Sequence, residues 1–498
     1  MQVAANLLTI ARVSRLARLR SSGVATKLCE LFRIDLRSLA AFRIGIAALV
    51  LVDLATRAPH IEATLTDTGV MPVAFLHPGN LYLTLHALSG SYAFEVGMFV
   101  FAAVAASLLL VGYFSRVSAV ITWVLVISLH NRNIFLNDGV DDLLRTLLFW
   151  GMFLPLGRKW AVDARGKPAP SEAAVLSPAT VALLLQFALF YVTCGLLKSG
   201  DEWHGTKDAI EIALRQSYWV RPFGEFLLGY PELLRVLTPT VAWFETLAPL
   251  LLFLPFWTPR VRMLVLVGFW GMMVGLGSSL HLNLMPWISS AATLPFLPAS
   301  FWQFIAKCAR SKAGASDGAP APDSPRPQNA RFVRLPRPQN AWFVRAKWSV
   351  VVLLIAHFAV TVPSAFGSAE QSWLRDVGQK LGLNLVWKMY AHAPSEDYEF
   401  DVVATLQNGS VVHVLGPDGP EYIRRAHDTY RIKYYMERLP RFPTFVKRQY
   451  AAWLAGSWDA GQPPPRRFAR VRVFVIVTPI KPPGPPQRRL IVDVHRGD

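Results

Sequence analysis

Four ionisable side chains lie at the ends of long apolar runs of this sequence or inside them. Lys198 closes one run, and His130 and His281 end two others. Glu245 lies about seven residues inside a further run, roughly 10 Å from its helix end at a rise of about 1.5 Å per residue. Amines, imidazoles and carboxylates are the groups that transfer protons in enzymes. If the runs cross a membrane, such residues are costly to bury, so each is a candidate functional residue.

Each of these side chains also has a purely structural interpretation. A Lys at a helix end usually extends its amine to water, and the two His side chains could bond carbonyl groups or water. A carboxylate as deep as Glu245 must be paired, protonated or exposed to a cavity, and Arg43 is one candidate partner. Arg43 and Asp53 are ten residues apart on one helix, about 15 Å along its axis, so they cannot pair with each other. Spacing alone leaves these alternatives open.

The elements that must position these residues are apolar helices. Of the 498 residues, 53% are hydrophobic and 17% are charged, whereas a soluble domain carries about 25% charged residues. The mean hydropathy is +0.32, and a helix needs about 20 apolar residues to cross the hydrocarbon layer. We expect spanning helices near residues 39–57, 93–114, 117–134, 141–157, 179–198, 238–256, 261–282, 284–305 and 348–366. The sequence therefore predicts an all-α polytopic membrane bundle of about nine transmembrane helices.

The formal net charge is +18, and its distribution indicates a membrane rather than a nucleic acid. Lys and Arg gather between the apolar runs, in segments that fall on one side if there are nine spans. By the positive-inside rule, the N-terminus is cytoplasmic and the C-terminus lies outside. Lys198, His130 and His281 then reach the same outer level. Asp141, Asp142 and Arg145 enter the fourth helix from that side.

We divide the chain into five parts. Residues 1–38 form a basic amphipathic cytoplasmic segment, whose arginines argue against a cleavable signal peptide. The membrane domain covers residues 39–306, and a basic cytoplasmic linker covers 307–347. A last transmembrane helix at 348–366 precedes a soluble α+β domain at 367–498. The linker contains two near-copies of one decapeptide, which indicate either a local duplication or a site for anionic lipid headgroups.

The C-terminal part has the pattern of a small α+β domain. Strand-like runs at 397–406 and 410–415 flank Asn408-Gly409, a hairpin signal. A helix is predicted at about 427–456, followed by strands at 470–478 and 489–495. The three cysteines, Cys29, Cys194 and Cys308, form no CxxC pair. A disulfide framework and a cysteine metal site are therefore not expected.

Several separate motifs occur in the order found in the HTTM (horizontally transferred transmembrane) domain family, which this chain resembles over roughly residues 35–305. They are Phe42-Arg43 with Asp53, His130-Asn-Arg-Asn133 leading to Asp141-Asp142-Leu-Leu-Arg145, the Gly195–Trp203 segment, Glu245 with Leu247-Ala-Pro249, and His281. The segment Trp387-Lys-Met-Tyr-Ala-His-Ala-Pro394 is similar to the start of the C-terminal module in bacterial relatives. The characterised member of the family is the vitamin K-dependent gamma-glutamyl carboxylase.

The resemblance implies a lyase that couples oxidation of a quinol to carboxylation. Gly195, Lys198 and Trp203 match the family's Gly-x-x-Lys and downstream Trp, which implies that Lys198 is the base for vitamin K hydroquinone. A Lys base must be neutral, and an apolar surrounding disfavours the charged form. His130 would support the quinol or the Lys, and His281 would be a third catalytic residue. Candidate pocket residues are Asn131, Asn133, Asp141, Asp142, Arg145, Trp203, Glu245 and Arg43. Oxygen and CO2 are the implied co-substrates, and no metal is expected.

The family also leaves other functions open. We expect a multi-pass protein of a bacterial inner (cytoplasmic) membrane that acts on a glutamate of an exported protein or peptide. The C-terminal part is much smaller than the luminal portion of the animal carboxylase and shows no feature for propeptide binding. The alternative is a non-carboxylating membrane protein for maturation of, or immunity to, an exported peptide. A transporter should show internal symmetry between its halves, and none is evident.

Overall fold

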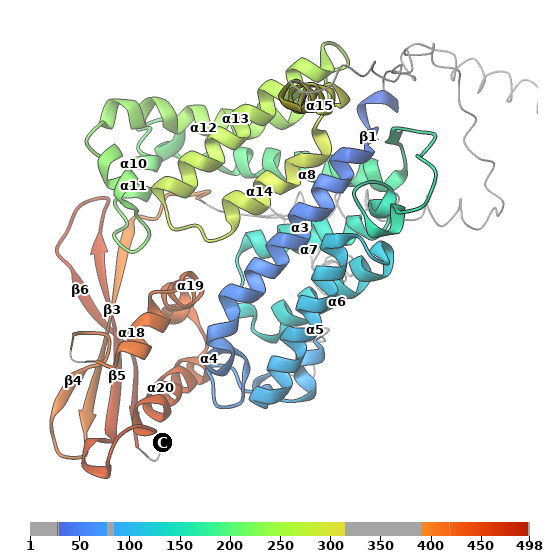
Figure 1. Cartoon of the computed structure of the whole chain (residues 1–498). Helices are drawn as coiled ribbons and strands as arrows, with labels where there is room; N and C mark the ends of the chain where they lie inside the picture. The colour runs from blue at the N-terminus through green and yellow to red at the C-terminus, as the bar shows by residue number, and fades with distance from the viewer. Residues whose placement is uncertain (1–26, 28, 77–83, 314–389, 418, 497–498) are drawn as a thin grey trace, which may run out of the picture.

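The protein consists of a long helical bundle and a smaller α+β domain that packs against one end of it (Figure 1). The computed structural model describes residues 27, 29–76, 84–313, 390–417 and 419–496. The bundle holds the described residues up to Ala313, and the C-terminal domain comprises the described residues from Tyr390 onward. Predictions for the segments at 1–26, for most of the basic linker and for the helix at 348–366 lie outside the described residues.

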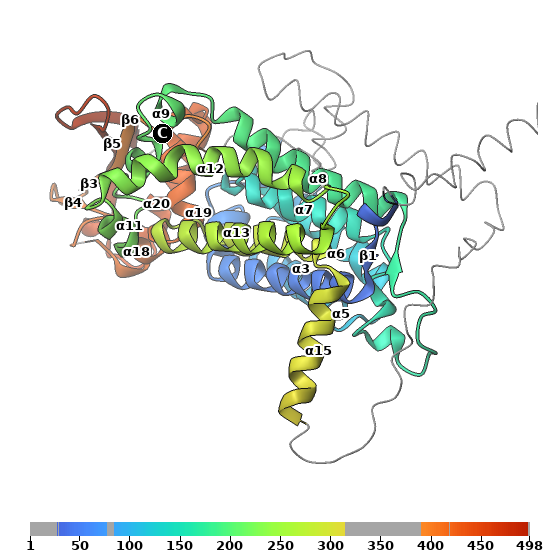
Figure 2. The same cartoon turned by 90° about the horizontal axis from the view of Figure 1, so that it is seen from above.

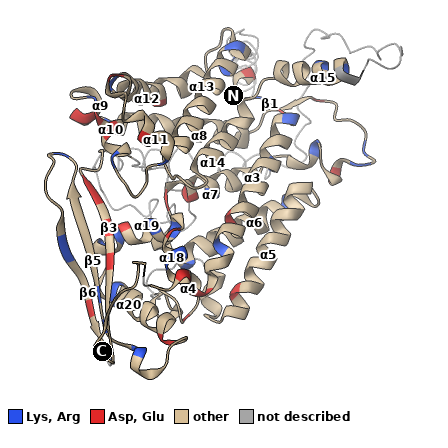
Figure 3. Ribbon diagram, turned by 60° about the vertical axis from the view of Figure 1, so that its left-hand side comes forward, with Lys and Arg blue, Asp and Glu red and all other residues tan. Residues whose placement is uncertain are grey.

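Four helical segments of the described chain are long and apolar enough to cross a membrane. They are Leu36–Leu65 (α3, Leu36–Arg57, with the short η1, Ala58–His60, and α4, Ile61–Leu65), α5 (Tyr92–Val111), α8 (Pro178–Leu197) and α13 (Thr258–Ser279). Large apolar side chains are exposed on their outer faces, such as Phe101 on α5 and Leu264 and Val274 on α13. Figure 3 shows few charged residues along α3 and α13. These features confirm a helical membrane protein.

The other predicted spans meet shorter or more polar helices. The described chain has α6 (Ser115–Arg132), α7 (Gly139–Gly151) and α12 (Pro231–Leu251) at three of these places. The total of about nine spanning helices is therefore not confirmed. The single helix predicted at 284–305 is wrong. The chain there forms α14 (Met285–Thr293), the short turn η7 (Leu294–Phe296) and α15 (Ala299–Ala313), because Pro295 and Pro298 lack the N–H groups of a continuous helix.

The C-terminal domain is an antiparallel four-stranded sheet with helices on one face. The strand order is β4 (Val411–His413), β3 (Glu396–Leu406), β5 (Phe468–Pro479) and β6 (Gln487–His495). The predicted strands are confirmed, and Gly409 makes the hairpin turn with φ +85°. Instead of one helix at 427–456, the domain has α18 (Glu421–His427), α19 (Tyr430–Arg438) and α20 (Thr444–Asp459). Pro440 and Pro443 lie between α19 and α20, where they cannot continue a helix.

The two parts share one interface, at the end of the bundle where α3 finishes (Figures 1 and 2). Tyr390, Tyr430 and Tyr434 of the C-terminal domain pack against the core of the bundle. Gln449 of α20 donates a hydrogen bond to the carbonyl of Gly69 at 2.8 Å. The opposite end of the bundle carries the small sheet of β1 (Ile34–Asp35) and β2 (Ala174–Val175).

Candidate functional site: two buried charge clusters beneath the C-terminal domain

The first cluster is an ion pair between helices α8 and α12. Lys198 is the C-cap residue of α8, and its Nζ lies 2.6 Å from Oε2 of Glu245 on α12. Each residue is only 3% exposed. Nζ also lies 3.4 Å from the carbonyl oxygen of Cys194 and 5.3 Å from the ring centroid of Trp203. Glu245 therefore pairs with Lys198, and the proposed pairing with Arg43 is wrong.

Gly195 permits this pair to form. A Cβ atom at Gly195 would lie 2.2 Å from Oγ1 of Thr246 and 2.9 Å from the carbonyl oxygen of Ala242, both on α12. The two helices approach so closely here that only a residue without a side chain fits. The Gly-x-x-Lys spacing thus has a structural cause, since Gly195 brings α12 within reach of the amine three residues later.

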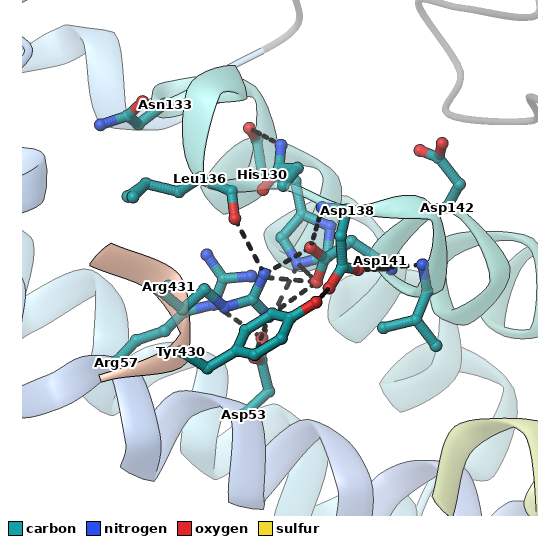
Figure 4. A network of polar contacts seen from close by, with 12 residues as sticks. Asp53, Arg57, His130, Asn133, Leu136, Asp138, Asp141, Asp142, Tyr430 and Arg431 are labelled. Carbon is teal, nitrogen blue, oxygen red and sulfur yellow. Dashed lines mark hydrogen bonds and ion pairs between the residues drawn. The ribbon is translucent and has the colours of Figure 1, made fainter. Parts of the chain in front are cut away.

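The second cluster joins three elements of the bundle to the C-terminal domain (Figure 4). Asp53 of α3 and Asp141 of α7 face each other, and two arginines bridge them. Arg57 donates from Nε to Asp53 at 2.9 Å and from Nη2 to Asp141 at 3.0 Å. Arg431 of α19 donates from Nη2 to Asp53 at 2.7 Å and from Nη1 to Asp141 at 2.5 Å. Burial alone would lower the pKa of Arg431, but Asp141 and Asp53 raise it well above its ordinary value.

His130 of α6 completes the second cluster. Its Nε2 lies 3.5 Å from Asp141 and 3.7 Å from Asp53, and neither ring nitrogen has a hydrogen-bond partner among the described residues. His130, Asp53 and Asp141 place ligand-type atoms within 4.8 Å of one another, a spacing that would suit a metal ion. The two carboxylates, however, already bind the guanidinium groups of Arg57 and Arg431, and these two positive charges balance the two negative charges. A divalent cation would be repelled by both, so the set does not fit a metal ion.

Residues of the C-terminal domain bridge the two clusters. Beside the first, Nε1 of Trp203 donates to the carbonyl of Tyr390 at 3.0 Å. Burial, and then the nearby Glu437, raise the pKa of the Tyr390 phenol. Beside the second, the Tyr430 hydroxyl donates to Oδ2 of Asp138, the N-cap residue of α7, at 2.8 Å.

Trp219, from the loop after α10 (Ala209–Leu214), connects these two contacts. Its Nε1 donates to Glu437 at 3.1 Å, and its ring lies 5.3 Å from that of Tyr430. The described contacts of Lys198 and His130 share no residue, and the C-terminal domain contacts residues beside both clusters.

A cavity of about 290 Å³ adjoins the second cluster. Its lining includes Arg57 and Thr64 at the end of the bundle, Asn283 after α13, and Tyr430 and Arg431 of α19. The cavity lies between the bundle and the C-terminal domain, and its lining combines polar groups from both with apolar side chains such as Leu65 and Ile432.

Of the remaining predicted pocket residues, some lie beside a cluster and others do not. Trp203 lies beside Lys198, as its motif implies. Asn131 is buried. Asn133 supports a turn, since its amide donates to the carbonyl of Thr64 at 3.0 Å. Asp142 pairs with Arg145 one turn later on α7, and it points away from the second cluster in Figure 4.

Two further predicted site residues, Arg43 and His281, also lie outside both clusters. Arg43 donates to the carbonyls of Leu156 and Trp160 at 3.0 and 2.5 Å. Arg43 therefore holds the loop that contains Leu156 and Trp160. This loop lies at the end of the bundle away from the clusters, because Arg43 is about 15 Å from Asp53 along α3. His281 follows the end of α13 and is exposed, with Arg221 donating to its Nδ1 at 3.3 Å. It has no described contact with Lys198 or His130, because its side chain is exposed while the neighbouring Leu280 and Leu282 enter the core.

Sequence reasoning missed the residues supplied by the C-terminal domain. Arg431, Tyr430 and Glu437 lie in α19, whose sequence has the pattern of an ordinary amphipathic helix. The one available signal was the need of Asp53 for a cationic partner other than Arg43, and Arg57, four residues later on the same helix, provides only part of that charge. That need does not identify which of the 51 Lys and Arg residues provides the charge.

The fold and the two clusters define a helical membrane protein whose buried charges are covered by an appended α+β domain. The chain belongs to the HTTM domain family, whose model matches residues 32–302. Similarity to the vitamin K-dependent carboxylase is a general property of this family. No curated protein matches the chain, and no solved structure matches it.

Proposed function

We propose that the protein oxidises a quinol of the vitamin K hydroquinone type with O2 and uses the reaction to carboxylate a glutamate with CO2. One observation carries the proposal: the amine of Lys198 is buried at the end of α8, in a position that matches the base of the family. Oxidation of the bound quinol by O2 would supply a base strong enough to remove the γ-proton of a glutamate.

The pair of Lys198 and Glu245 would act as one proton acceptor. The Lys198 amine would take the proton of a quinol hydroxyl, and Glu245, 2.6 Å from Nζ, would stabilise the ammonium that forms. A buried site also excludes water, which would otherwise return a proton to the quinol anion or to the strong base formed later. Trp203, beside the amine, would provide an aromatic face for the ring. The cavity beside Arg57 and Arg431 is our candidate site for the polar part of the second substrate.

Epoxide formation tests the first half of this proposal. The purified protein in lipid, given vitamin K hydroquinone and O2, should form vitamin K epoxide. Lys198→Ala should reduce the rate by at least about 100-fold, the usual contribution of a positioned base. Lys167→Ala, an exposed lysine, is the matched control and should keep full activity. Equal turnover in the Lys198 variant would reject its role.

Incorporation of labelled CO2 tests the second half separately. A glutamate-containing peptide should gain label only in the presence of the quinol and O2. Epoxide without incorporated label would leave a quinol-epoxidising enzyme that does not carboxylate that peptide. If neither epoxide nor incorporated label is formed, the enzymatic proposal is rejected.

A second candidate is a non-carboxylating membrane protein that assists, or protects against, an exported peptide. The close contact of Lys198 with Glu245 favours it, because a buried ion pair at 2.6 Å also has a purely structural role, the compensation of two buried charges. This function predicts that one exported protein co-purifies with the chain. Its recovery should be unaffected by Lys198→Ala and lost when residues 367–498 are deleted.

A further inference from the structure

Helix α15 leaves the bundle at the end opposite the C-terminal domain. It runs across the direction of α12 and α13 and extends away from them (Figure 2). Its base is fixed to the start of α3, because Nε1 of Trp302 donates to Oγ of Ser38 at 2.8 Å. Ser38 and Arg57 are 19 residues apart on α3, about 28 Å along the axis. The base of α15 thus lies about one hydrocarbon thickness from the second cluster.

A group of exposed aromatic residues marks this level of the molecule. Tyr113 and Phe114 lie at the turn between α5 and α6, and Phe256 and Trp257 lie at the turn between α12 and α13. Trp160 is also exposed, and its ring packs against that of Trp302 at 5.2 Å. Aromatic side chains gather where a membrane protein meets the headgroup layer. The level of α15 therefore has the composition of a membrane interface.

The surface of α15 is divided into an apolar and a basic side. Phe304 and Ile305 are 62% and 45% exposed, and Cys308 continues their stripe one turn later. Gln303, Lys307 and Arg310 lie on the other side at helical spacing and are exposed. A helix with an apolar stripe and a basic face lies in the plane of a membrane surface, with the stripe in the acyl region.

We propose that α15 is an interfacial helix that binds the anionic lipid surface of the leaflet opposite the C-terminal domain. Phe304 and Ile305 enter the boundary between headgroups and acyl chains. Lys307 and Arg310 contact lipid phosphates, because an anionic membrane surface attracts basic side chains next to it. The occupant is lipid because the exposed stripe lies at the level of the aromatic residues and its flank is positively charged.

Nitroxide labels on the full-length protein in vesicles test the orientation of the helix. In a Cys29→Ser background, with Cys194 buried, a label on Cys308 reports the stripe. A label at Gln303→Cys, with Cys308→Ser, reports the polar side. We expect the Cys308 label to collide several-fold more often with O2 than with a water-soluble nickel complex, and the Gln303 label to show the reverse. Equal access of nickel to both labels would overturn the proposal. Shielding of Cys308 from both reagents would also overturn it, since a protein segment or a second copy would then cover the stripe.

Vesicles of phosphatidylcholine, with or without phosphatidylglycerol, test the charge preference. The label on Cys308 should lie deeper when phosphatidylglycerol is present. Lys307→Glu with Arg310→Glu should abolish that difference. Arg425→Glu with Arg448→Glu, exposed residues of the C-terminal domain, are the matched control and should retain it. The same depth in both kinds of vesicle for the unchanged helix would refute binding of anionic lipid.

Discussion

Lys198 and Glu245 depend on each other for their place in the membrane bundle. Both are buried, and their charges are compensated chiefly by one contact of 2.6 Å. Removing one partner of such a pair leaves an unpaired charge and costs about 3–5 kcal/mol, whereas replacing both by apolar or neutral groups is often close to neutral. A comparison of single and double variants of this pair therefore distinguishes its structural role from its chemical role.

We predict that Lys198→Met and Glu245→Gln each lower the melting temperature of the detergent-solubilised protein more than the double variant does. The double variant should be folded and inactive in epoxide formation, so loss of activity would not reflect loss of structure. Additive losses in the double variant would contradict this coupling.

His427 makes the stability of the C-terminal domain depend on pH. Its Nδ1 lies 2.7 Å from the carbonyl of Ile423, and its Nε2 lies 2.7 Å from the hydroxyl of Tyr450. The neutral ring satisfies both, donating to the carbonyl and accepting from the phenol. Burial lowers its pKa from the ordinary 6.5 to about 4. The unfolded chain therefore binds a proton more readily than the folded domain between these values.

This histidine should contribute its stability above about pH 6.5 and lose it as the pH falls toward 4. The loss should reach about 3 kcal/mol at the lower limit, since one pKa unit corresponds to about 1.4 kcal/mol. Melting temperatures of the full chain across this range measure the effect, with His427→Gln as comparison. The slope should be smaller in the variant, and an unchanged slope would assign the pH dependence to other groups.

At the scale of elements, α19 holds the two parts of the protein together. Its Arg431 balances the charge of Asp53 and Asp141 from outside the bundle, so the second cluster is incomplete without the C-terminal domain. Arg431→Met should leave one uncompensated carboxylate in the interface. We predict that the domain then separates more readily, which limited proteolysis of residues 390–496 would detect as faster cleavage.

Neutralising one carboxylate should reverse that effect. Asp53→Asn combined with Arg431→Met leaves Asp141 paired with Arg57, so the net charge of the cluster returns to zero. The double variant should be cleaved more slowly than Arg431→Met alone. If Asp53→Asn fails to slow cleavage, the arginine contributes through packing and not through charge.

The elements show where sequence reasoning succeeds and where it ends. Apolar runs predicted α3, α5, α8 and α13 because length and composition decide whether a helix can cross a membrane. The hairpin at Gly409 followed from turn chemistry that acts over two residues. Contacts between distant elements left no such local signal. The sequence could require a partner for Asp53, but only the packing of α19 against the bundle identifies Arg431.

At the scale of the whole molecule, the two ends of the bundle differ in chemistry. One end carries α15 and the loop that contains Arg158, Lys159 and Lys167. The other end carries both charge clusters beneath the C-terminal domain. Positively charged loops favour the cytoplasmic side, so the first end should face the cytoplasm and the second the exterior.

We therefore predict opposite accessibility of the two ends in intact bacterial cells that express the protein. A membrane-impermeant maleimide should label Ser410→Cys, at the exposed hairpin of the C-terminal domain, in a chain that carries Cys29→Ser and Cys308→Ser. In the same background it should label Gln303→Cys, on the polar side of α15, only after the cells are opened. Labelling of Gln303→Cys in intact cells would reverse the orientation. It would also place Lys198 at the cytoplasmic surface, where an exported peptide could meet it only before export.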